Sequence, residues 1–110
     1  HANAAASPYA EGIEVYHFPG SGAGQHAAHE IRWQLMTRFP DHRDRGVKEA
    51  NFTVLRRTWM PAVLVECSFL SHRDEEQRLR DPEYRQQVAD SIHIGIENFV
   101  ARRRMLTEAR

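Results

Sequence analysis

The feature that most constrains the fold is a short apolar run that ends on a carboxylate. Residues 62–65 read Ala-Val-Leu-Val, they follow Pro61, and Glu66 comes directly after them. A β-branched run of this length predicts a strand covered on both faces, as in the parallel or mixed sheet of an α/β domain. Ligands bind at the carboxyl ends of strands in such sheets, so Glu66 is a candidate functional residue. The alternative is a glutamate that caps a helix or pairs with an arginine.

The composition is that of one small domain or of a piece of a larger one. Of the 110 residues 41% are hydrophobic, and 15 acidic side chains balance 15 basic ones. A net charge of zero gives no indication of nucleic-acid or membrane-surface binding, and no apolar stretch approaches the roughly 18 residues of a membrane span. The single cysteine, Cys67, is expected to be a small core residue and not a nucleophile. The start at His1, without methionine or signal peptide, indicates a processed or truncated product.

Three segments besides residues 62–65 predict strands or the loops that join them. The alternation of apolar and polar residues over 12–18 is typical of a strand with one solvated face. Residues 52–56 predict a further strand, and the charged residues 41–46 predict a loop before it. Together with the helices below, these strands predict an α/β fold with a mixed or mostly parallel sheet flanked by helices.

Apolar residues at steps of three and four predict the helices. One covers about residues 25–39, and a short, highly charged one covers 73–80. Asp81 is a good N-cap for a long terminal helix with Pro82 in its first turn, and we expect that helix to pack on the sheet. The polar residues 101–110 are expected to fray.

Seven histidines raise the question of a metal site. His26 and His29 lie at i, i+3 on a predicted helix, a spacing that can hold a metal, but surface histidines in the polar first turns are the more common case. His29 and Glu30 begin an HExxH zinc-peptidase motif, yet Trp33 replaces its second histidine. The others apart from His1 are interpreted as structural or exposed: His17, His42, His72 and His93.

Six segments occur in an order that resembles a known family. They are His1-Ala2-Asn3-Ala4, residues 12–16, 45–48, 52–56 and 60–66, and Phe69-Leu70-Ser71. With the terminal helix, they resemble the C-terminal half of the catalytic domain of the zinc-dependent N-acetylmuramoyl-L-alanine amidases, the amidase-3 family. The resemblance extends from His1 to about Val100, and six segments in the right order and spacing are specific.

The resemblance implies roles for two residues, and Asn3 is a third candidate beside them. His1 matches a histidine that binds zinc, and Glu66 matches the catalytic carboxylate. Asn3 either binds the substrate or braces its loop, and bracing is slightly favoured. The residues after Glu66 depart from the usual Thr-Gly-Phe, since Cys67 and Ser68 occupy the first two places.

Arg45 and Lys48 are a further pair of candidates. They precede residues 52–56 and are interpreted either as contacts for stem-peptide carboxylates or, more commonly, as solvated loop charges. His72 stands where the family has asparagine, and no role is assigned to it.

The implied function is zinc-dependent hydrolysis of the amide bond between N-acetylmuramic acid and L-alanine in peptidoglycan, outside the cytoplasm. The family's first two zinc ligands, a histidine in a Gly-His-Gly segment and a glutamate, precede the match to His1. We therefore expect residues 1–110 to be the C-terminal part of one amidase catalytic domain, inactive alone. The alternatives are a non-catalytic peptidoglycan-binding fragment and a zinc peptidase acting on stem peptides. A copper site at an amino-terminal His1 is given little weight.

Overall fold

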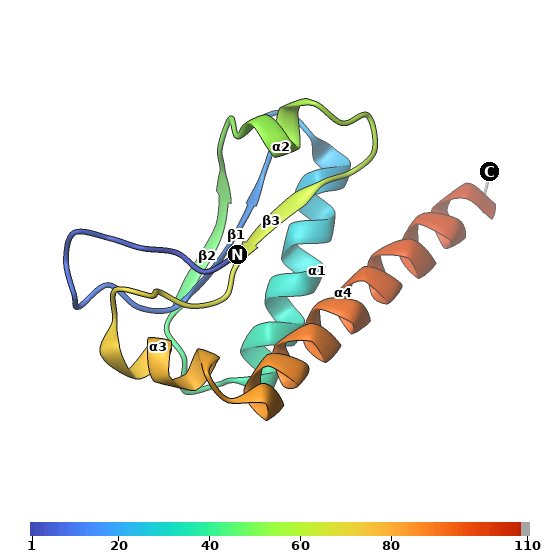
Figure 1. The fold of residues 1–110 in the computed structure, drawn as a ribbon. Coiled ribbons are helices and arrows are strands. Elements are labelled where there is room, and N and C mark those ends of the chain that lie inside the picture. Colours follow the sequence, from blue (N-terminus) through green and yellow to red (C-terminus); the bar gives the residue numbers. More distant parts are fainter. Residues whose placement is uncertain (109–110) are drawn as a thin grey trace.

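The computed structural model describes residues 1–108, in which strands and helices follow one another along the chain (Figure 1). The elements are β1 (Ile13–His17), α1 (Gly22–Arg38), β2 (Asp44–Glu49), α2 (Thr53–Arg56), β3 (Val63–Glu66), α3 (Arg73–Leu79) and α4 (Pro82–Glu108). This confirms the α/β class and the long C-terminal helix. Across residues 1–108, every helix is too short or too polar to cross a membrane.

Within the described residues the strands form one mixed sheet in the order β2-β1-β3. β1 pairs in parallel with β2 and antiparallel with β3. The strand predicted to have a solvated face, β1, is instead the central one, and Tyr16 is the one residue of β1 that is not buried. The strand predicted to be covered on both faces, β3, lies at the sheet edge, so its apolar residues Val63–Val65 are half-buried.

Helix α1 covers one face of the sheet with its apolar side. Ser21 caps the helix, since its Oγ accepts a hydrogen bond from the Gly24 amide at 3.0 Å. The alternation along β1 directs Ile13 and Val15 toward α1, where they form the core with a set of residues from the two long helices. Those residues are Ala28, Ile31, Leu35 and Phe39 from α1 and its end, and Tyr84 and Val88 from α4.

Helix α4 packs chiefly on α1 and not on the sheet as expected. A Cβ atom at Gly95 would lie 2.7 Å from the Cα atom of Ile31, so glycine permits the two helix backbones to approach closely. Figure 1 shows α4 alongside α1, with its carboxyl-terminal half extending away from the sheet. The helix continues to Glu108 instead of fraying from residue 101; residues 109–110 lie outside the described part of the chain.

Two local predictions between β1 and β3 were wrong. The predicted loop 41–46 ends in β2, a strand of low hydropathy whose charged residues are held by ion pairs. The predicted strand 52–56 is the single-turn helix α2, in which Leu55 is buried while Val54 points to solvent. Phe52 before it packs edge-on against Tyr16, with ring centroids 5.1 Å apart.

Candidate functional site

Glu66 lies at the carboxyl end of β3 and is 8% exposed. One carboxylate oxygen, Oε2, is buried without a hydrogen-bond partner among the described residues. Burial raises the pKa of Glu66, and the negative charge of Glu14 raises it further. An unpartnered, desolvated carboxylate with a raised pKa is suited to accept a proton.

His1 lies beside Glu66 because residues 1–3 run parallel to the end of β3. The main-chain oxygen of His1 accepts from the Cys67 amide at 3.2 Å, and the Asn3 amide donates to the Ser68 oxygen at 2.7 Å. Asn3 and Phe69 form a parallel bridge. The His1 side chain is 70% exposed, and its Nδ1 atom is 3.8 Å from Glu66 Oε1. The two residues singled out from the sequence therefore meet in space.

Asn3 is held by groups of the chain itself. Its side-chain amide donates to Glu14 Oε1 at 2.7 Å, and its side-chain oxygen accepts from the Ala4 amide at 2.8 Å. Because both ends of the side chain are engaged internally, the geometry favours a bracing role over a substrate contact.

Glu14 is a buried carboxylate that the sequence did not single out. It is 2% exposed and accepts hydrogen bonds from Asn3, Tyr16, Arg45 and Lys48. Burial alone would raise the pKa of Glu14, but the hydrogen bonds from Lys48, Tyr16 and Arg45 lower it overall. Burial and the bond to Glu14 raise the pKa of Tyr16 to about 12, so its hydroxyl remains a donor.

Arg45 and Lys48 lie on β2 and not in a loop. Arg45 Nε donates to Glu14 Oε2 at 3.1 Å, and its guanidinium carbon lies 4.9 Å from the centroid of the Phe69 ring. Lys48 forms an ion pair with the same carboxylate. The sequence analysis interpreted Arg45 and Lys48 as solvated loop charges or as contacts for peptide carboxylates. Neither interpretation included Glu14 as their partner, because β1 was expected to have a solvated face.

Glu75 is a second buried carboxylate that the sequence did not single out. It is 2% exposed on the first turn of α3, where its two oxygens accept from the amides of Gly12 and Phe69. These bonds tie the start of β1 to the segment after β3. A glutamate in a highly charged helix carries no signal in the sequence that distinguishes it from its exposed neighbours.

The remaining histidines do not gather into a metal site. Among residues 1–108, no group of three or more His, Cys, Asp or Glu side chains is placed to hold a metal ion. His26 pairs with Glu30 at 3.2 Å, and His72 caps α3 while lying 3.2 Å from Glu11. His1 and Glu66 nevertheless fit part of such a site, since an exposed imidazole stands beside a carboxylate that has an unpartnered oxygen.

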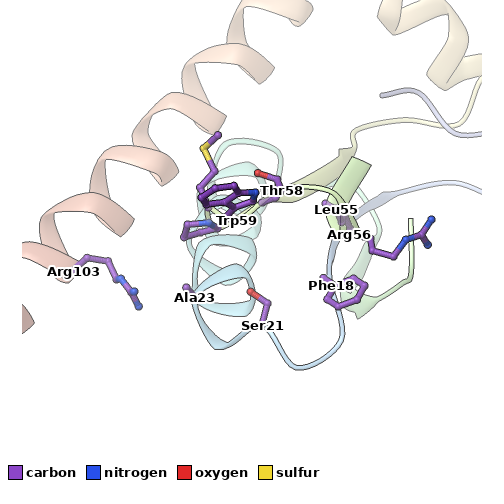
Figure 2. Close-up of a pocket in the computed structure, with 11 residues that line it drawn as sticks. Phe18, Ser21, Ala23, Leu55, Arg56, Thr58, Trp59 and Arg103 are labelled. Atoms are coloured by element: carbon purple, nitrogen blue, oxygen red, sulfur yellow. The ribbon is translucent and has the colours of Figure 1, made fainter. Parts of the chain in front are cut away.

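A cavity of about 340 Å³ lies at the opposite end of the sheet from Glu66 (Figure 2). It is formed where β1 ends and β3 begins, and its lining includes Phe18, Ser21, Trp59, Met60 and Arg103. Neither His1 nor Glu66 lines it, so it is separate from the candidate site.

Residues 1–98 match the family described as N-acetylmuramoyl-L-alanine amidase. The chain is similar to the N-acetylmuramoyl-L-alanine amidase CwlM of Bacillus licheniformis, with 37% identity over 85 residues, which are 77% of this chain and 34% of that protein. The curated relatives it matches are thus considerably longer than this chain.

Solved structures of similar fold lead to the same family. The structure of the N-acetylmuramoyl-L-alanine amidase from Clostridium difficile 630 has a TM-score of 0.88 and 33% identity, covering 92% of this chain and 55% of that one. The amidase AmiC2 of Nostoc punctiforme has a TM-score of 0.85 and 32% identity over the same shares. The fold and the matched residues together show that this chain belongs to the amidase-3 family of N-acetylmuramoyl-L-alanine amidases.

Proposed function

We propose that this chain is part of the catalytic domain of a cell-wall amidase that cleaves the amide bond between N-acetylmuramic acid and L-alanine in peptidoglycan. The observation that carries the proposal is the meeting of His1 and Glu66, which are far apart in the sequence of a chain that matches the family over residues 1–98. The chain spans about half of the solved amidase chains, so other residues of the complete domain contribute to the site.

Glu66 is the proton-transfer residue in this proposal. An amide is a poor electrophile and neutral water a poor nucleophile, so a base must take a proton from the attacking water and an acid must protonate the leaving amine. Within residues 1–108, Oε2 of Glu66 has no hydrogen-bond partner, so it has no bond to that part of the chain to give up before it accepts the proton. The raised pKa of Glu66 also favours the protonated carboxyl, which then returns the proton to the departing L-alanine nitrogen.

His1 is the metal ligand that this chain contributes. Its imidazole is open to solvent, and its main chain is fixed by hydrogen bonds to the segment after β3. A bound zinc ion would polarise the scissile carbonyl and acidify a water molecule to a pKa of about 7. A catalytic zinc site needs three protein ligands. In this proposal the other two come from the part of the amidase domain that this chain does not span.

The protein acts outside the cytoplasm in this proposal, where peptidoglycan is exposed to hydrolases.

Asn3 braces the His1 segment and does not touch substrate, because Glu14 and Ala4 engage both ends of its side chain.

The test is product and metal analysis of the complete protein on purified peptidoglycan. We expect stoichiometric zinc and intact stem peptides with a free L-alanine amino terminus. Cleavage within the stem peptide would show that the protein is a peptidase and not an amidase. If the protein binds peptidoglycan but contains no zinc and releases no peptide, it is a non-catalytic binding module.

A further inference from the structure

Glu14 is the most deeply buried carboxylate of the sheet, and the proposed reaction does not use it. It lies on β1, 2% exposed, directly opposite Glu66 of β3. Burying a carboxylate is costly unless it is paired and hydrogen-bonded, so a retained one calls for an explanation. The hydrogen bonds of Glu14 indicate what this buried carboxylate does.

The two carboxylate oxygens of Glu14 accept hydrogen bonds from different groups of donors. Oε1 accepts from Asn3 Nδ2 at 2.7 Å and from the Tyr16 hydroxyl at 2.8 Å. Oε2 accepts from Arg45 Nε at 3.1 Å and from Lys48. The cations therefore balance the charge on one oxygen while the other is left to hold Asn3.

An irregularity in β2 makes this arrangement possible. Ile13 pairs with Asp44 and Glu14 with Gly46, so Arg45 is an extra residue in the strand. Arg45 and Lys48 are three positions apart and would point to opposite faces of a regular strand. The bulge shifts the alternation, so both side chains reach Glu14, and bulges commonly redirect side chains in this way beside active sites.

Asn3 transmits the position of Glu14 to His1. The Asn3 main chain is bonded on both sides, from its amide to the Ser68 oxygen and from the Leu70 amide to its own oxygen, both at 2.7 Å. Its side chain adds the bond to Glu14, which reaches across from β1. Two residues earlier, His1 leaves this anchored segment with its imidazole beside Glu66.

We propose that Glu14 is a positioning residue that acts through Asn3 to hold His1 in its orientation beside Glu66. The inference rests on the proposed function, because it gives His1 the role of a zinc ligand. Groups that orient a metal ligand typically change metal affinity or activity by about 10–100-fold when they are altered.

A reciprocal exchange of amide and carboxylate tests the contact in the complete protein. Asn3→Asp sets a second carboxylate against Glu14 Oε1, and Glu14→Gln leaves Arg45 and Lys48 facing an amide. In the double variant the amide introduced at position 14 can donate to the carboxylate introduced at position 3, and its oxygen can accept from the cations. The contact is thereby restored with the same net charge.

We expect each single variant to bind zinc about 10–100-fold more weakly in competition with a chelator, and the double variant to return to within a few-fold of the parent. Hydrogen exchange at the amides of Asn3 and Ala4 in zinc-free protein should be faster in the singles and slow again in the double. Gly95→Ala is the control, because it strains the α1–α4 contact without touching the site; it should lower the melting temperature and leave zinc affinity unchanged.

Parent-like zinc affinity in Glu14→Gln, or a double variant as weak as the two single losses combined, overturns the inference while the amidase assignment stands. Should Glu14→Gln not fold alone, Asn3→Asp and the double variant decide the question by the same criterion. A parent protein that binds no zinc overturns the proposed function and this inference together.

Discussion

Glu14 and Glu66 are direct partners across the antiparallel β1–β3 pair, so two buried carboxylates stand side by side on one face of the sheet. Their surroundings differ. Hydrogen bonds from Lys48, Tyr16 and Arg45 lower the pKa of Glu14 in spite of its burial, whereas burial, with the charge of Glu14, raises the pKa of Glu66. Neighbouring carboxylates with pKa values moved apart take separate roles. Here one stays ionised as an anchor, and the other is free to exchange a proton.

Replacement of Glu66 should separate proton transfer from metal binding. In the complete protein, Glu66→Gln keeps the size of the side chain and most of the zinc but loses the base, so hydrolysis should fall by roughly 10²–10⁴-fold. His1→Ala removes a metal ligand and should lower zinc content and activity together. Zinc content, melting temperature and peptide release are measured for both variants beside the parent. A folded, zinc-loaded Glu66→Gln protein with near-parent rates would remove Glu66 from the mechanism.

Replacement of Glu75 should loosen the junction between β1 and the segment after β3. Its carboxylate accepts from two buried amides, and a glutamine can accept with one oxygen only. We expect Glu75→Gln to reduce the free energy of unfolding by about 1.5–3 kcal/mol in urea titrations. The control is Glu76→Gln, which breaks an i, i+4 pair with Arg80 and should cost no more than about 0.5 kcal/mol. Equal losses in the two variants would contradict the anchoring role of Glu75.

Addition of a methyl group at Gly95 should force α1 and α4 apart. The new Cβ atom would meet backbone atoms of Ile31 at 2.7 and 3.0 Å, which a rotamer change cannot relieve. Overpacking of this kind costs about 1–3 kcal/mol, which exceeds the roughly 1 kcal/mol by which alanine improves a helix over glycine. Gly95→Ala should therefore melt at a lower temperature, while Gly22→Ala, with open space around it, should melt at the same or a higher one. Stabilisation by Gly95→Ala would show that the helices are not in close contact.

His42 should make the fold less stable in acid. Burial and the nearby charge of Arg78 lower the pKa of His42, while Asp41 and Glu11 act in the opposite direction. Its Nε2 atom lies 2.8 Å from Arg78 Nη1 and must be unprotonated to accept that hydrogen bond. The unfolded chain therefore binds more protons, and the stabilisation is complete above the unfolded pKa of 6.5 and is lost as the pH falls through the lower folded value.

Urea unfolding at pH 5 and pH 8 measures this effect. His42→Gln has no titrating ring and can still accept from Arg78, so its stability should fall less between the two values than that of the parent. Parallel losses in parent and variant would show that His42 is not the group responsible.

The sequence carried most of the information needed to choose Glu66 and His1 as candidate site residues, and the structure places them side by side. The apolar run before Glu66 identified the strand, and the order of the family segments identified His1, because both are local patterns. β2 was missed because it is a charged strand whose place is set by distant partners, Arg32 on α1 and Glu14 on β1. Glu14 and Glu75 were missed for the same reason. A buried carboxylate and a solvated one look alike in sequence, and only long-range contacts distinguish them.

The bond between the Cys67 amide and the His1 oxygen has a consequence for how the protein folds. It joins residues 66 positions apart, so its formation closes more than half of the described chain into a loop and must overcome the entropy of closing that loop. Non-local parallel pairing of this kind forms slowly. His1 and Glu66 therefore come together late, and partly folded chains lack the pair, so the function proposed for these two residues would depend on complete folding.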